Sequence, residues 1–232
     1  MRQLAKRLLN RVQKSHLAPV PNLDCDQFEI NNWIMSDFVA HRLVPIVGYH
    51  PYPLNEMMLM AGTVCRFKPS YIFEWGTNLG VSARIFHETA SFFQINTQIH
   101  SVDLPDDIEH EEHPKNLRGK FVKGKNNVHL HLGDGLKTSL DIYNSLPEGE
   151  TVLFFVDGDH SYESVKKELS EIVKQVKSPK VLLHDTFYQT EKSNYNIGPH
   201  QAVTEVMDEF GEDLGLKRER ENIGLPGMTL VY

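Results

Sequence analysis

The sequence predicts an α/β fold, with a doubly wound, mostly parallel sheet that ends in an antiparallel hairpin. From about residue 56, apolar runs of strand length alternate with amphipathic segments of helix length, and Gly, Asp or Pro marks each junction. Such alternation is typical of parallel strands that are joined by helical crossovers. We expect five such strands, at residues 71–74, 99–103, 128–132, 152–157 and 181–183.

The clearest crossover helix is SYESVKKELSEIVKQV, at residues 161–176. Its apolar residues recur at helical spacing, and Ser161 is a suitable N-cap. Residues 214–220 and 228–232 lie on either side of a turn at Pro226 and Gly227, which predicts the terminal hairpin.

Residues 1–55 are expected to form an N-terminal helical or lid segment, ahead of a main domain at residues 56–232. Basic residues from Arg2 to Lys14 precede the first acid, Asp24, and the stretch LAPVPN follows them. We interpret this as an amphipathic helix and a linker: a solvated arm, or alternatively a docking element for a membrane surface, a partner or a second copy in a homo-oligomer. Several aromatic residues are candidates for a lid, or for simple packing: Trp33, Phe38, Tyr49, Tyr52 and Trp75.

The composition of the 232 residues excludes several classes of protein. A formal net charge of −7 argues against a protein that binds nucleic acid, so we expect a small-molecule partner. No apolar run approaches the roughly 18 residues of a membrane span, and the first residues lack the apolar core of a signal peptide. Cys25 and Cys65 form no CxxC pair. We therefore expect a cytoplasmic protein with reduced cysteines.

Polar residues follow the first three strands, where ligands bind in an open α/β sheet. In EWGTNLGVSA, Gly76 and Gly80 would allow a tight turn and a close approach to a ligand, although the motif is not the GxGxxG of nicotinamide enzymes. Asp103 ends the second strand, where a carboxylate can accept hydrogen bonds from a ribose diol. GDG ends the third, and its Asp134 suits an adenine amine, although a plain turn explains it equally well.

The fourth and fifth strands end in FFVDGDHSY and LLHDTF. Asp157 follows one strand directly, and His184 and Asp185 follow its neighbour, so three potential metal ligands would converge at one edge of the sheet. Carboxylates suit Mg²⁺ or Mn²⁺, whereas an imidazole shifts the preference toward softer transition ions. Alternatively, Asp157 and Asp185 cap the following helices, and His184 is a hydrogen-bonded histidine near the core.

The ordered motifs EWGTNLGVSA, Asp103, GDG, VDGDHSY and HDT resemble those of class I S-adenosylmethionine-dependent methyltransferases, and most closely the O-methyltransferase branch with catechol and macrolide-sugar enzymes. The resemblance covers about residues 56–232 and implies a seven-stranded, Rossmann-like sheet. It implies that Asp103 holds the ribose and that Asp134 lies beside the adenine. It also implies a set of residues around the methionine end of the cofactor: Glu74, Gly76, Asn78, Gly80 and Ser82.

The same resemblance implies a divalent metal, Mg²⁺ or Mn²⁺, held by Asp157, His184 and Asp185, and a general base at His160. This chain departs from the family at His184, because the metal-binding pair is usually two carboxylates, or a carboxylate and an amide.

The chemistry of methyl transfer explains why a hydroxyl acceptor would need both a metal and a base. An alcohol has a pKa comparable to the roughly 15.7 of water, whereas an imidazole titrates near about 6.5. The gap of about nine pKa units corresponds to a free energy on the order of 12 kcal/mol. A bound cation can close much of it, and a phenol, with a pKa of about 10, needs less help.

We therefore expect an enzyme that moves a methyl group from S-adenosylmethionine to a hydroxyl of a small molecule, such as a sugar, a phenol or a natural product. One alternative is a non-catalytic cofactor-binding or scaffold protein, against which the presence of Asp157, His160 and Asp185 together argues. Another is a metal-dependent hydrolase, which would leave the glycine-rich turn and Asp103 without a role.

Overall fold

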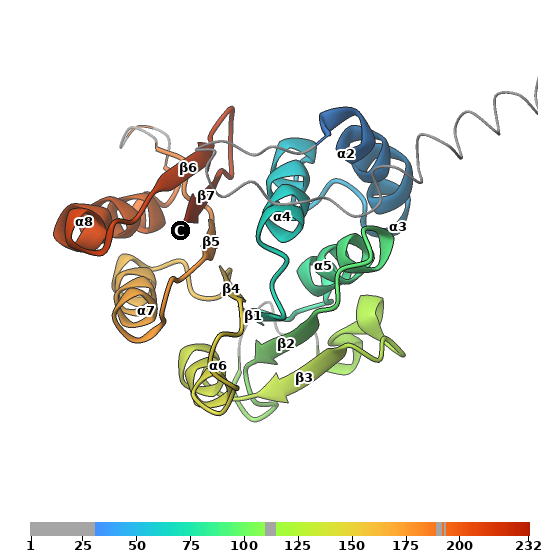
Figure 1. Cartoon of the computed structure of the whole chain (residues 1–232), viewed down its shortest axis with the longest axis horizontal. Helices are drawn as coiled ribbons and strands as arrows, with labels where there is room; N and C mark the ends of the chain where they lie inside the picture. The colour runs from blue at the N-terminus through green and yellow to red at the C-terminus, as the bar shows by residue number, and fades with distance from the viewer. Residues whose placement is uncertain (1–30, 110–114, 189–191, 193) are drawn as a thin grey trace, which may run out of the picture.

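The computed structural model describes residues 31–109, 115–188, 192 and 194–232 (Figure 1). The expected basic helix, the linker LAPVPN and Cys25 lie outside the described residues. Cys65 is a free, buried cysteine.

A seven-stranded sheet forms the centre of the molecule, in the order β3-β2-β1-β4-β5-β7-β6. The first five strands are parallel, and β7 runs antiparallel to both β5 and β6, which confirms the predicted fold class. The strands are β1 (Tyr71–Trp75), β2 (Gln98–Asp103), β3 (Val128–Leu132), β4 (Val152–Val156), β5 (Val181–His184), β6 (Arg218–Glu221) and β7 (Met228–Val231). The strand order reverses between β1 and β4, which makes the carboxyl ends of these two strands the expected ligand site.

Three strand boundaries differ from the prediction in ways that matter for the site. β4 ends at Val156, so Asp157 is the first residue beyond the strand, and β5 extends by one residue to include His184. The first strand of the hairpin was expected from residue 214, which is wrong. Helix α8 continues to Leu214 and ends at Gly215, which adopts φ +64°, so β6 begins only at Arg218.

Helices cover both faces of the sheet (Figure 1). One face carries α2 (Asn32–Phe38), the π-helical turn η1 (Val39–Leu43), α3 (Val44–Val47), α4 (Leu54–Phe67) and α5 (Val81–Phe92). The other face carries α6 (Gly135–Tyr143), α7 (Tyr162–Gln175) and α8 (Gly198–Leu214). Two short 3₁₀ turns, η2 (Lys115–Leu117) and η3 (Lys120–Val122), lie between β2 and β3.

Alternating strand residues divide the core between these two faces, as the two-residue period of a strand requires. In β4, Leu153 and Phe155 pack with α4 and α5, whereas Phe154 and Val156 pack with the helices of the opposite face. Helix α7 is amphipathic as predicted, and the Ser161 side chain caps it by accepting a hydrogen bond from the amide of Ser164 at 3.2 Å. In the part of the chain that is described, no helix is long and apolar enough to cross a membrane.

Three imidazoles form a stack on the sheet, beside its β3 edge. His100 lies on β2, with ring centroids 4.9 Å from His129 and 5.2 Å from His131 on β3. The ring of His100 also stacks on Phe73 at 5.5 Å. Burial, followed by the two neighbouring histidines, lowers the pKa of His100 to about 4.

Candidate active site

The turn after β1 touches the chain at the end of β4, which joins the predicted cofactor motif to the predicted metal motif. β1 and β4 are paired as far as Trp75 and Val156, and the next residues are Gly76 and Asp157. Gly76 adopts φ +90°, and a Cβ placed on it would lie 2.2 Å from the carbonyl oxygen of Asp157. Because no other residue has both this backbone freedom and no side chain, glycine is required for the close approach.

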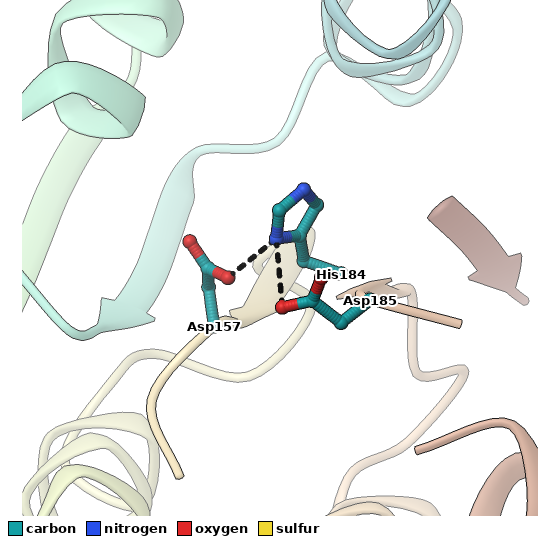
Figure 2. Close-up of side chains that lie close together, drawn as sticks. All are labelled: Asp157, His184 and Asp185. Atoms are coloured by element: carbon teal, nitrogen blue, oxygen red, sulfur yellow. Dashed lines mark hydrogen bonds and ion pairs between the residues drawn. The ribbon is translucent and has the colours of Figure 1, made fainter. Parts of the chain in front are cut away.

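The ends of β4 and β5 bring Asp157, His184 and Asp185 together, as the sequence predicts. Figure 2 shows both carboxylates pointing toward Nδ1 of His184. That nitrogen lies 2.8 Å from Oδ1 of Asp157 and 3.4 Å from Oδ2 of Asp185. Each residue offers one potential ligand atom, and these atoms lie within 4.8 Å of one another. Two carboxylates and an imidazole with their ligand atoms this close together fit a divalent cation.

The alternative interpretation made Asp157 and Asp185 helix caps and His184 a hydrogen-bonded histidine near the core, and the structure agrees only with the part about His184. Ser161 caps α7, and α8 has no side-chain cap, so among the described helices neither Asp157 nor Asp185 acts as a cap. His184 is indeed buried and hydrogen-bonded. Burial lowers the pKa of His184, but the surrounding carboxyl groups outweigh burial and raise this pKa well above its ordinary value.

Glu56 is a residue of the site that the sequence analysis missed. It lies in the first turn of α4 with none of its surface exposed. Its Oε2 lies 3.0 Å from Nε2 of His184, and its Oε1 accepts a hydrogen bond of 2.8 Å from the amide of Gly227. The only indication in the sequence is an acid one helical turn before Met60, on a face that is otherwise apolar.

Two tyrosines donate hydrogen bonds to the carboxylates, and the ring of Tyr52 also packs edge-on against the ring of His184, with the centroids 5.0 Å apart. The hydroxyl of Tyr52 donates to Oδ2 of Asp157, and the hydroxyl of Tyr195 donates to Oδ1 of Asp185. Burial and the charge of Asp157 raise the pKa of Tyr52 well above its ordinary value, so it remains a donor. Tyr52 was among the aromatic candidates for a lid, whereas Tyr195 was not anticipated.

The other aromatic candidates have different positions. Trp33 and Tyr49 are exposed, and Phe38 and Trp75 are packed in the core.

His160 lies at the edge of this cluster. Its Nδ1 is 3.1 Å from Oδ2 of Asp185, and its side chain is 38% exposed. No described residue hydrogen-bonds its Nε2. The nearby carboxylate of Asp159 is an alternative proton acceptor, but it already accepts hydrogen bonds from Ser161 and Ser164. The hydroxyl of Ser164 holds the pKa of Asp159 below its usual range, so Asp159 is a weaker base than an ordinary aspartate.

The residues predicted to hold the methionine end of a cofactor surround the turn after β1. Glu74 is 1% exposed, and its Oε1 accepts a hydrogen bond of 2.6 Å from Ser101. Burial raises the pKa of Glu74 to about 7, against the opposing effect of the Ser101 and Ser82 hydroxyls. No donor among the described residues hydrogen-bonds its buried Oε2. Gly80 precedes α5 with φ +80°. An unsatisfied buried carboxylate oxygen beside a glycine turn fits a cationic ligand group.

Asp103 lies at the end of β2 and already has three donors around its carboxylate. Its Oδ2 accepts from the amide of Asn78 at 3.2 Å and from Nε of Arg118 at 2.9 Å, and its Oδ1 accepts from the amide of Leu104 at 2.9 Å. The ion pair with Arg118 was not predicted. Asp134 is the N-cap of α6, through a hydrogen bond of 2.7 Å from the amide of Lys137 to Oδ1, so its turn has a structural role.

The fold and this site define a class I S-adenosylmethionine-dependent methyltransferase. Residues 73–186 match a family model described as a methyltransferase domain. A comparison of the sequence with curated proteins finds no match.

Solved structures with the same fold cover most of the chain. The SAH-bound methyltransferase PaMTH1 of Podospora anserina is 17% identical, with a TM-score of 0.55 over 99% of this chain and 94% of that one. An O-methyltransferase of Bacillus cereus in complex with SAH is 12% identical, with a TM-score of 0.58 over 89% and 93%. TomG of Streptomyces achromogenes, in complex with SAM, is 12% identical, with a TM-score of 0.54 over 86% and 87%. At these identities the likeness establishes the fold.

Proposed function

We propose that this methyltransferase moves the methyl group of S-adenosylmethionine to a hydroxyl of a small molecule, with the help of a divalent metal. The observation that carries the proposal is the set of three potential ligand atoms, from Asp157, His184 and Asp185, within 4.8 Å of one another beside the turn after β1. The donor of the methyl group and the activated acceptor would thus meet where β1 and β4 end.

Asp157, His184 and Asp185 would hold the metal. Their two carboxylates suit Mg²⁺ or Mn²⁺, and the imidazole favours the transition ion of the two. When bound, the cation would supply the positive charge that lowers the pKa of an acceptor hydroxyl. Tyr52 and Tyr195 use the remaining carboxylate oxygens and so orient both ligands.

His160 is the proposed general base. The carboxylate of Asp185 lies 3.1 Å from Nδ1 of His160 and would orient the ring, which leaves Nε2 to take the proton of the acceptor. Asp159 is a poorer candidate because its carboxylate is already hydrogen-bonded at the start of α7.

The cofactor would lie along the ends of β1, β2 and β3. The buried Oε2 of Glu74 would bind the ammonium group of the methionine part, with Gly76, Asn78, Gly80 and Ser82 around it. Asp103 would bind the ribose, and the Oδ2 of Asp134, which does not cap α6, would face the adenine amine.

Two alternatives are less well supported. The match to a methyltransferase domain disfavours a hydrolase. A non-catalytic scaffold would have no use for an imidazole that lies against Asp185 with its second nitrogen left without a hydrogen-bond partner among the described residues.

Methyl transfer from labelled S-adenosylmethionine to a panel of sugars and phenols tests the proposal, with purified protein before and after chelation. We expect S-adenosylhomocysteine to raise the melting temperature, and chelation to abolish turnover without unfolding the protein. Mn²⁺ should restore the activity. A folded protein that binds no S-adenosylhomocysteine would refute the cofactor, and undiminished turnover after exhaustive chelation would refute the metal.

A further inference from the structure

Glu56 connects three segments that are far apart in the sequence. It lies on α4, contacts His184 at the end of β5, and accepts a hydrogen bond from Gly227 just before β7. Its side chain is fully buried, and no Lys or Arg among the described residues lies within ion-pair distance of it. A carboxylate buried without such a cation is costly, so its contact with His184 requires an explanation.

The hydrogen bonds of Glu56 determine which nitrogen of His184 carries a proton. The amide of Gly227 can only donate, so Oε1 of Glu56 must accept. The second carboxylate oxygen, Oε2, is also an acceptor, so Nε2 of His184 must donate to it. The other nitrogen, Nδ1, lies 2.8 Å from a carboxylate oxygen of Asp157, which is also an acceptor, so without a metal Nδ1 carries a proton too. A cation bound between Asp157, His184 and Asp185 would displace that proton and leave the one on Nε2.

We propose that Glu56 is a positioning residue that keeps a proton on Nε2 of His184 and thereby presents the lone pair of Nδ1 to the metal. This inference rests on the proposed function. In metal sites generally, a ligating histidine donates its second N–H to a carboxylate, which fixes the tautomer and the orientation of the ring. Here the carboxylate comes from α4, 128 residues before its partner.

The substitution Glu56→Gln keeps the shape of the side chain and reverses the tautomer. The amide oxygen of the glutamine must face the N–H of Gly227, so its NH₂ group faces Nε2 of His184. That nitrogen must then accept, which moves the proton to Nδ1 and removes the lone pair. We expect the affinity for Mn²⁺, measured by calorimetry, to fall ten- to hundredfold, and the affinity for S-adenosylhomocysteine to stay unchanged.

Glu88→Gln is the matched control. Glu88 is 5% exposed and lies on α5, where it pairs with Arg42 and Arg84. This variant should lose stability but bind Mn²⁺ as the wild type does. A double-mutant cycle adds specificity: in a His184→Asn background, Glu56→Gln should cause no further loss of Mn²⁺ affinity, because no tautomer remains to be set.

A measurement on the wild-type protein tests which nitrogen of His184 binds the metal, and it does not depend on whether a variant folds. With histidine labelled by ¹⁵N at one ring position, pulsed EPR of bound Mn²⁺ should show hyperfine coupling to Nδ1. Coupling to Nε2, or equal Mn²⁺ affinities of Glu56→Gln and wild type, would overturn the role of Glu56 and leave the proposed function standing. A wild type that binds no Mn²⁺ would overturn the proposed metal, and this inference with it.

Discussion

Replacing Gly76 by alanine should disrupt the point where the cofactor turn meets the metal ligands. A non-glycine residue in a left-handed conformation costs roughly 1–2 kcal/mol, and Gly76 adopts φ +90°. The added Cβ would also lie 2.2 Å from the carbonyl oxygen of Asp157, and forcing an atom into a packed site typically costs about 1–3 kcal/mol. Together these terms predict a loss of roughly 2–5 kcal/mol in the free energy of unfolding, a large share of the about 5–15 kcal/mol typical of a domain.

Gly149→Ala separates the cost of the left-handed backbone from the cost of the steric clash. Gly149 adopts a similar φ of +95°, but nothing lies within 4 Å of a Cβ placed on it. Urea unfolding of both variants should show a loss near the backbone cost alone for Gly149→Ala, and about 1–3 kcal/mol more for Gly76→Ala. Only Gly76→Ala should weaken the binding of S-adenosylhomocysteine and Mn²⁺, because it displaces Asp157. Equal losses of stability in the two variants, with ligand binding intact in both, would refute the reasoning.

Three further predictions follow from the site and the core. His160→Ala should lower turnover by about 10²–10⁴ with little change in S-adenosylhomocysteine affinity, and near-wild-type turnover would remove His160 as the base. Asp103→Ala should weaken S-adenosylhomocysteine binding about ten- to hundredfold in calorimetry. Asp106→Ala, which removes another partner of Arg118, should leave this binding unchanged. Similar losses of affinity in the two variants would show that Asp103 acts only through its ion pair with Arg118. The pKa of His100, about 4, lies below that of an unfolded histidine, so the folded state binds fewer protons between about pH 4 and 6.5, and the wild type should lose stability as the pH falls through that range. His100→Phe should lose less over the same range in urea unfolding, and an unchanged pH dependence would contradict this.

The sheet and the convergence of Asp157, His184 and Asp185 could be predicted because both follow from local patterns. An apolar run of five residues bounded by polar ones specifies a buried strand wherever it lies in the chain. Parallel strands place their carboxyl ends at one edge, so residues after two such runs become neighbours without any knowledge of the helices between them. The exact strand ends depend on hydrogen bonding to neighbours, which is why β5 took in His184 and β6 began later than expected.

The residues around the three potential ligands could not be predicted, because each reaches the site through tertiary packing. Glu56 meets His184 only after α4 has packed on the sheet, and Tyr52 meets Asp157 across 105 residues. Tyr195 lies in the segment between β5 and α8, where no periodic pattern constrains the chain. Arg118 likewise reaches Asp103 from the connection between β2 and β3.

These contacts show how the segment before β1 contributes to the site. Leu43 of this segment and Phe86 of α5 belong to the same buried cluster, so the first helices pack as part of the core on that face of the sheet. Tyr52 lies five residues after the end of α3, and α4 begins two residues later and carries Glu56. The two side chains contact Asp157, directly after β4, and His184, the last residue of the neighbouring strand β5. Because both contacts depend on where α4 begins, the packing of residues 31–55 determines the geometry of the potential metal ligands.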